Sequence, residues 1–119
     1  MSVSVLVVDD DPAFRGLARR MLTAAGLGIA GEAGTVAAAT AAALELRPGA
    51  MLVDIGLPDG DGITLARELA SLPWRPRIVL TSMDADAASA DDVAGSGAAM
   101  FLPKAELPTA SLALLLAQA

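Results

Sequence analysis

Several residues that could bind a metal ion or a phosphate group come directly after apolar segments of this sequence. They are Asp9 and Asp10 after residues 3–8, Asp54 after residues 51–53, Thr81 after residues 78–80, and Lys104 just beyond residues 98–102. Carboxylates that lie close together repel one another, and a bound cation relieves that repulsion. A lysine ammonium and a threonine hydroxyl are suited to bind phosphate oxygens. The residue types therefore indicate a site that holds a cation, a phosphate group and a carboxylate together.

The chemistry that fits this set best is phosphoryl transfer to a carboxylate. Hard oxygen ligands suit Mg²⁺, which keeps several waters and often shares a phosphate oxygen. Asp54 would act as the nucleophile and form an aspartyl-phosphate, while metal and lysine neutralise the transferred charge. Lys104 is the only lysine of the chain. Each residue alone also has an ordinary explanation, because Asp is common in turns and at helix starts and most lysines are solvated.

The apolar segments alternate with helical patterns and predict a parallel sheet covered on both faces. Strands are expected over residues 3–8, 27–32, 51–54, 78–80 and 98–102. Gly28 and Gly31 interrupt the second of these, which suggests an edge position. The carboxyl ends of parallel strands meet at one edge of the sheet, where ligands bind in open α/β folds. This arrangement would bring the candidate residues together.

Capping signals and apolar spacing predict the helices. Asp11 is a natural N-cap, Pro12 a natural first helical residue and Gly26 a plausible stop, and Thr35 can cap a second helix. The apolar face of the first helix is expected to contain Phe14, Leu17, Ala18, Met21, Leu22 and Ala25. A third helix is expected over residues 63–72 and a last one starting at Pro108.

The segment 84–97 is the least structured part of this prediction. Val93 is its one large apolar residue. Because the segment has little to bury, any helix in it should be short and weakly held, and its mobility should be the highest of the domain.

Length and composition limit the class of protein. A chain of 119 residues is large enough for one domain with a single core. It has no cysteine, and no apolar run approaches the length of a membrane span, so we expect a soluble, cytoplasmic protein. The net charge of -6 argues against direct contact with nucleic acid, which requires a basic surface.

Four segments together resemble the receiver domain of response regulators over essentially the whole chain. They are Leu6-Val7-Val8-Asp9-Asp10-Asp11, Asp54-Ile55-Gly56-Leu57-Pro58-Asp59-Gly60-Asp61-Gly62, Leu80-Thr81-Ser82 and Phe101-Leu102-Pro103-Lys104. The first and last segments look most like receivers that precede a helix-turn-helix output domain. The resemblance implies a single flavodoxin-like, doubly wound domain over residues 1–119, with strand order 2-1-3-4-5. Right-handed crossovers would then place the first and last helices on one face and the other three on the opposite face.

By the same resemblance, Asp54 matches the phosphoacceptor of a two-component system. Asp9 and Asp10 match the acidic pair that holds Mg²⁺ with Asp54, and the backbone carbonyl of Gly56 matches the third protein contact to the metal. The phosphoryl donor is then a sensor histidine kinase or a phosphotransfer protein.

Three further residues match those that respond to the phosphate. Lys104 corresponds to the phosphate-binding lysine and Thr81 to the switch hydroxyl. Phe101 corresponds to the switch aromatic, and the alternative for this residue is a core aromatic of a strand. We expect an output protein, or a second copy of the domain, to bind through residues 84–119. The chain is either a stand-alone receiver or a fragment of a longer regulator.

Two other functions fit parts of the pattern. Haloacid-dehalogenase-like phosphatases use a similar residue set on a related fold, with a second acid two residues after the nucleophile. Here Gly56 has that position, so no side chain there supplies an acid to the leaving group. A receiver-like interaction domain that no longer takes phosphate is the other alternative, and the complete acid set with Lys104 speaks against it.

Overall fold

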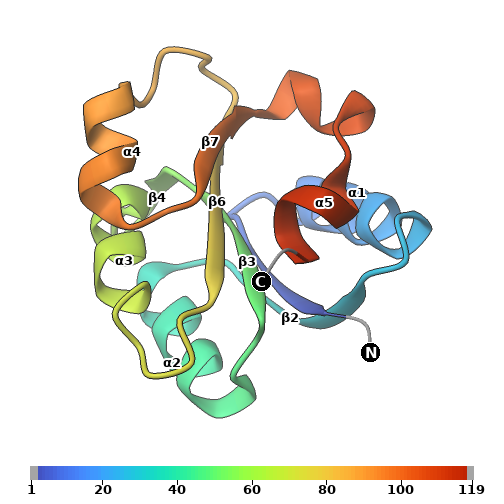
Figure 1. Ribbon diagram of the computed structural model, residues 1–119, viewed down its shortest axis with the longest axis horizontal. Coiled ribbons are helices and arrows are strands. Elements are labelled where there is room, and N and C mark those ends of the chain that lie inside the picture. The colour runs from blue at the N-terminus through green and yellow to red at the C-terminus, as the bar shows by residue number, and fades with distance from the viewer. Residues whose placement is uncertain (1–2, 118–119) are drawn as a thin grey trace.

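A five-stranded parallel sheet forms the centre of the computed structural model, which describes residues 3–117 (Figure 1). The order of its strands is β2-β1-β3-β6-β7, which is the predicted order 2-1-3-4-5 once the strands of this sheet alone are counted. In that order they span Gly28–Ala33, Ser4–Val8, Ala50–Asp54, Arg77–Ser82 and Met100–Pro103. The glycine-containing strand β2 lies at an edge, as predicted.

A small hairpin follows β3 and was not predicted. Its strands β4 (Gly56–Leu57) and β5 (Gly60–Asp61) pair antiparallel with each other and form a sheet of their own. The segment is rich in turn-forming residues. Each of its strands has only two residues, too few to show the alternation of apolar and polar residues that predicts a strand. The five-stranded sheet remains parallel throughout.

Helices cover both faces of the sheet (Figure 1). They are α1 (Pro12–Ala24), α2 (Val36–Leu46), α3 (Gly62–Leu69), α4 (Ala90–Ser96) and α5 (Leu112–Ala117), with a 3₁₀ helix, η1, at Lys104–Thr109. One apolar cluster joins α1 and α5 to the sheet and another joins α2 and α3, beside which α4 lies. The predicted division into two and three helices is therefore confirmed.

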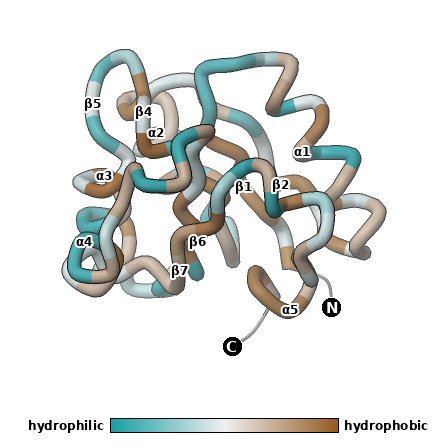
Figure 2. Tube along the Cα trace, turned by 90° about the horizontal axis from the view of Figure 1, so that it is seen from above, coloured by the Kyte–Doolittle hydropathy of each residue, from teal (hydrophilic) through white to brown (hydrophobic). Residues whose placement is uncertain are grey.

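Alternate residues of the central strands point into the two clusters. Val5 and Val7 of β1 face α1 and α5, while Leu6 and Val8 face α2 and α3. All five residues of β3 are buried. Burial of each large aliphatic side chain contributes about 1.5–3 kcal/mol to stability. These continuous apolar runs therefore favour a sheet that is covered by helices on both faces. In Figure 2 the hydropathy along the trace follows this division, with β6 and β7 largely apolar and several of the connecting segments hydrophilic.

The predicted helix starts are confirmed at their caps. The Asp11 side chain accepts a hydrogen bond from the Ala13 amide at 3.0 Å, and the Thr35 hydroxyl accepts one from the Ala38 amide at 3.0 Å. Gly26 adopts a φ of 87° just beyond α1, a conformation that glycine reaches without strain. These local hydrogen bonds explain why single residues predict the starts.

Three local predictions were wrong. Leu17 is 43% exposed, because α1 contacts the sheet through the narrower stripe of Ala18 and Leu22. Helix α3 ends at Leu69 rather than at residue 72, and the Leu72 amide bonds to the Leu69 carbonyl in a tighter turn. Pro108 lies inside η1, where burial of the neighbouring Leu107 holds the turn, and α5 begins only at Leu112.

Helix α4 is short, as predicted for segment 84–97. It has seven residues, and Ser96 alone among them is buried. A capping box between Ser89 and Asp92 begins it. The helix thus has a strong local cap and little buried surface of its own, and the high mobility of the segment stays a prediction.

We expect Gly62→Ala to destabilise the domain by about 1–3 kcal/mol, as overpacking usually does. A Cβ at Gly62 would lie 2.4 Å from the carbonyl oxygen of Asp54 and 2.8 Å from the Cα of Ile55. Both neighbours are backbone atoms, so β3 or α3 must shift. Urea denaturation measures the loss.

Gly95→Ala is the matched control for this substitution. In the described part of the chain, its own helix backbone and chain neighbours apart, no heavy atom lies within 4 Å of a Cβ built there, one residue before the end of α4. Alanine at a compatible helical site stabilises by about 0.4–1 kcal/mol. Equal stability of the two variants would show that the contact at Gly62 does not constrain the strand end.

Candidate functional site

Three of the predicted residues lie side by side at the carboxyl edge of the sheet. Asp9 follows β1, Asp54 ends β3, and Thr81 of β6 is the direct neighbour of Asp54 in the register. Asp9 and Thr81 are fully buried, and Asp54 is 7% exposed. Asp10 is exposed and supplies a third carboxylate. One carboxylate oxygen from each of Asp9, Asp10 and Asp54 lies within 4.8 Å of the others.

Backbone amides fix one oxygen of each buried carboxylate. Asp9 Oδ1 accepts a hydrogen bond from the Asp11 amide at 2.9 Å, and Asp54 Oδ1 accepts one from the Gly56 amide at 3.3 Å. The turn after each strand therefore orients the side chain at the strand's end. The second oxygen of each carboxylate remains for other contacts.

Lys104 reaches into this cluster from the start of η1. Its Nζ lies 2.6 Å from Asp9 Oδ2 and 3.6 Å from Asp54 Oδ2, and its side chain is only 10% exposed. The ammonium also lies 4.1 Å from the centre of the Phe14 ring. From the sequence, Phe14 is predicted only to lie on the apolar face of α1; the cation–π contact depends on how α1 and η1 pack, which has no signal in the sequence.

Two buried polar atoms at the site are not hydrogen-bonded within residues 3–117. They are Asp9 Oδ2 and the Thr81 hydroxyl. Asp9 Oδ2 is close to Lys104, but the contact lacks hydrogen-bond geometry, so it is an ion pair only. An unsatisfied buried polar group costs about 1–3 kcal/mol, and such groups concentrate at functional sites.

The electrostatics of Asp54 follow from its neighbours. Burial raises the pKa of the Asp54 carboxyl, and the charge of Asp9 raises it further, while Lys104 opposes both. The ionised form of Asp54 is thus disfavoured, and a bound cation would favour it.

The residues present fit a hard divalent cation such as Mg²⁺. The available ligands are carboxylate oxygens, one of them the buried and unsatisfied Asp9 Oδ2, and the exposed Asp10 leaves an open side for water. Gly56 follows Asp54 closely, and its amide bonds to that side chain. The metal contact predicted for the Gly56 carbonyl stays a prediction.

Phe101 lies outside the acidic cluster. It is half-buried on β7, directly beside Leu80 in the register, one position away from Thr81. It borders a surface groove of about 540 Å³ between β7 and α4, with Ala88, Val93 and Met100 among the other lining residues. The predicted switch pair is therefore on adjacent strands, and Phe101 has open space beside it.

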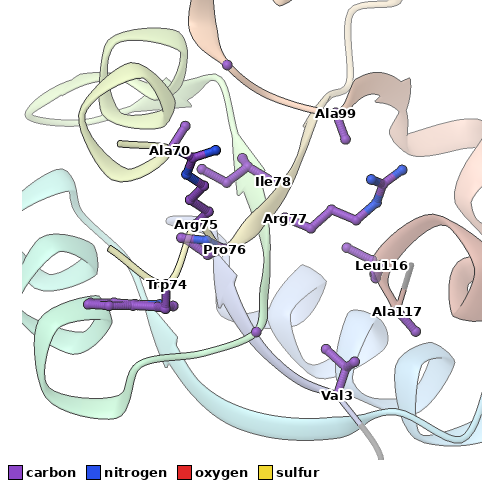
Figure 3. Close-up of a pocket in the computed structure, with 12 residues that line it drawn as sticks. Val3, Ala70, Trp74, Arg75, Pro76, Arg77, Ile78, Ala99, Leu116 and Ala117 are labelled. Carbon is purple, nitrogen blue, oxygen red and sulfur yellow. The ribbon is translucent and has the colours of Figure 1, made fainter. Parts of the chain in front are cut away.

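A larger cavity of about 650 Å³ lies at the opposite edge of the sheet (Figure 3). Trp74, Arg75 and Arg77 line it, and the predicted site residues are not among its described lining. Arg77 donates to the Leu115 carbonyl, and Trp74 donates to the Pro48 carbonyl at 3.2 Å. The two arginine side chains point to different sides in Figure 3, so they do not converge on one ligand.

Asp59 is a residue of the site loop whose role the sequence did not indicate. From the hairpin after Asp54 it accepts hydrogen bonds from the amides of Val36 at 2.7 Å and Ala37 at 3.1 Å. These bonds lower the pKa of the Asp59 carboxyl. The loop is thereby tied to the start of α2, a contact between segments far apart in sequence.

We expect Asp59→Asn to lower the urea midpoint at pH 7, with a difference that shrinks in acid. A lowered folded-state pKa contributes stability above the ordinary carboxyl value of about 3.9 and loses it as pH falls through the folded value. Denaturation from pH 7 to pH 2.5 measures this. Asp61→Asn is the control, since Asn caps a helix as well as Asp. A difference independent of pH would contradict the charge argument.

Comparison with known proteins identifies the class. The sequence profile of the family described as "Response regulator receiver domain" matches residues 5–115. The DNA-binding transcriptional activator DevR/DosR of Mycobacterium tuberculosis is 38% identical over 104 residues, which are 86% of this chain and 48% of that protein. The solved signal receiver domain of NarL from Mycobacterium tuberculosis has a TM-score of 0.83 and 31% identity, and the match covers 98% of both chains. This chain therefore belongs to the family of response regulator receiver domains.

The outputs of its relatives differ. A protein-glutamate methylesterase/protein-glutamine glutaminase of Alkalilimnicola ehrlichii is 37% identical over 87% of this chain, which is 27% of that protein. The chain thus spans between about a quarter and a half of these curated relatives. Receiver domains of response regulators interact with histidine kinases and output domains.

Within residues 3–117 no helix is long and apolar enough to cross a membrane.

Proposed function

We propose that this domain is a phosphorylation-dependent switch in which Asp54 accepts a phosphoryl group. The observation that carries the proposal is that Asp9, Asp10, Asp54 and Lys104 lie close together at one edge of the sheet. In the transfer, an Asp54 carboxylate oxygen forms a bond to phosphorus. The bond from phosphorus to the imidazole nitrogen of a phosphohistidine breaks, and its electron pair stays on that nitrogen. A sensor histidine kinase or a phosphotransfer protein is the donor.

Mg²⁺ is the cofactor that this ligand set fits, and when bound it would neutralise charge on the transferred group. Asp9, Asp10, Asp54 and the Gly56 carbonyl would hold it. Lys104 already lies between the two buried acids, where it can pair with a phosphoryl oxygen as a second positive charge. The buried hydroxyl of Thr81 is without a hydrogen-bond partner in residues 3–117 and can donate to the same group.

The signal leaves the site through Thr81 and Phe101 in this proposal. A move of Thr81 toward the phosphoryl group would disturb the β6–β7 register, in which Leu80 and Phe101 are neighbours. The groove between β7 and α4 offers room for Phe101 to change its position. Output proteins, or a second copy of the domain, would then distinguish the two states through residues 84–119.

A phosphatase of the haloacid-dehalogenase type is less well supported. Gly56 provides no side chain that could protonate a leaving group, and the carboxylates of Asp9 and Asp10 are taken up by the cation site proposed above. The domain would therefore hold a phosphoryl group and lose it slowly, without turnover of a phosphomonoester.

Intact mass after incubation with acetyl phosphate tests the proposal. We expect one phosphoryl adduct per molecule when Mg²⁺ is present and little or none when EDTA replaces it. An adduct that forms equally well in EDTA would overturn the metal assignment, and no adduct under either condition would favour a domain that no longer takes phosphate.

A further inference from the structure

Arg15 connects the acidic site to the second strand of the sheet. Its Nη1 donates a 2.6 Å hydrogen bond to the backbone carbonyl of Asp9, and its Nε donates a 3.0 Å bond to Glu32 Oε1. The other oxygen of Glu32 pairs with Arg19 Nη1 at 2.6 Å. One guanidinium on α1 thus bridges the end of β1 and a carboxylate on β2.

The Asp9 carbonyl is the atom from which the acidic turn leaves the sheet. The Asp9 amide bonds to the Ala33 carbonyl at 2.9 Å, and Asp9 Oδ1 accepts from the Asp11 amide at 2.9 Å. The bond from Arg15 is the third of these constraints, and it fixes the plane of the peptide that joins Asp9 to Asp10. The direction of the exposed Asp10 carboxylate depends on that plane.

The neighbouring backbone leaves room for this contact. A Cβ built on Gly34 would lie 3.3 Å from Arg15 Nη1, 3.8 Å from the Asp9 carbonyl oxygen and 3.9 Å from the Asp10 Cα. The missing side chain at Gly34 therefore lets the guanidinium approach the turn. Arg15 is 20% exposed, so its position is held by packing as well as by its partners.

We propose that Arg15 is a positioning residue that orients the Asp9–Asp10 turn for cation binding. The proposal rests on the metal site of the proposed function and adds a residue that does not touch the metal. Residues that orient metal ligands without touching the metal change its affinity by about 10- to 100-fold when they are removed.

Electrostatics alone predicts the opposite result for Arg15. Removal of a positive charge near a carboxylate cluster should strengthen the binding of a cation, because the repulsion between like charges falls. Loss of orientation should weaken it. The sign of the change in Mg²⁺ affinity therefore separates a positioning role from a simple effect of charge.

The experiment titrates Mg²⁺ into four forms of the full chain and follows backbone amide shifts of Asp10 and Gly56 by NMR. The forms are wild type, Arg15→Gln, Arg15→Lys and Arg19→Gln. We expect the Kd of Arg15→Gln to rise about tenfold. Arg15→Lys should bind as weakly, since one ammonium cannot reproduce the fork between the Asp9 carbonyl and Glu32. Arg19→Gln removes the same charge from the same helix and breaks the ion pair between Arg19 and Glu32, but it leaves the bond from Arg15 to the Asp9 carbonyl in place. Its Kd for Mg²⁺ should therefore stay within about twofold of wild type or fall.

Each outcome has a distinct meaning. Unchanged or tighter binding by Arg15→Gln, or full affinity in Arg15→Lys, would overturn the positioning role while the metal site stands. Failure of wild type and Arg19→Gln to bind Mg²⁺ would overturn the proposed function itself. Urea denaturation of every form excludes a merely structural role, which would lower the midpoint and leave the Kd of the folded protein unchanged.

Discussion

Asp54→Asn is expected to abolish the phosphoryl adduct that acetyl phosphate produces on the wild-type chain. The asparagine amide has nearly the same shape but lacks the anionic oxygen that attacks phosphorus. The predicted loss is complete within the sensitivity of intact-mass measurement, that is, more than about 100-fold, in line with removal of a nucleophile. The wild-type adduct should also be released by hydroxylamine, because it is an acyl phosphate.

Asp61→Asn is the matched control for this substitution. Asp61 belongs to the loop that follows Asp54, is exposed, and caps α3 through a 2.8 Å bond to the Ile63 amide. Asparagine is an equally good cap, so this variant should take the phosphoryl group as wild type does. An adduct that persists in Asp54→Asn, or that maps to a serine or threonine, would refute the assignment of Asp54.

Substitution of the acidic pair should have the second largest effect, on Mg²⁺ affinity. We expect Asp10→Asn to raise the Kd for Mg²⁺ by at least about tenfold, and Asp9→Asn with Asp10→Asn to raise it further. A unit charge about 4 Å from another contributes about 1 kcal/mol in water and about 4 kcal/mol near a protein surface. Every 1.4 kcal/mol changes a Kd about tenfold. Titration calorimetry measures the affinities.

Asp11→Asn controls for the loss of net charge. Asp11 stands next to the acidic pair, but its side chain caps α1 and is not part of the carboxylate cluster. Its replacement should leave the Kd within about twofold of wild type, as an exposed charge outside the cluster is screened. Equal Kd values for Asp10→Asn and Asp11→Asn would mean that the cation is attracted by the net negative charge of the protein and not bound by the carboxylate cluster. Since Asp10 is exposed, loss of fold is not expected to confuse the comparison.

The sequence by itself determined the topology of this protein and the neighbourhood of its site. Apolar runs such as residues 51–53 are buried on both faces of a parallel sheet, and polar residues at their ends meet at one edge for geometric reasons. The proximity of Asp9, Asp10 and Asp54 follows directly, as do the helix starts at Asp11 and Thr35. These features depend on strand order and on contacts within a few residues, which a single sequence records.

The tertiary structure alone decided which groups face one another inside that neighbourhood. It placed Lys104 closer to Asp9 than to Asp54, put Phe14 against the ammonium, and left the Thr81 hydroxyl without a partner in residues 3–117. It also moved the start of the last helix beyond Pro108, because Leu107 is buried in the preceding turn. The bridge from Arg15 to the Asp9 carbonyl and Glu32 joins three separate elements. Such contacts depend on the packing of helices against the sheet and on side-chain rotamers, and neither produces a periodic or local signal in the sequence.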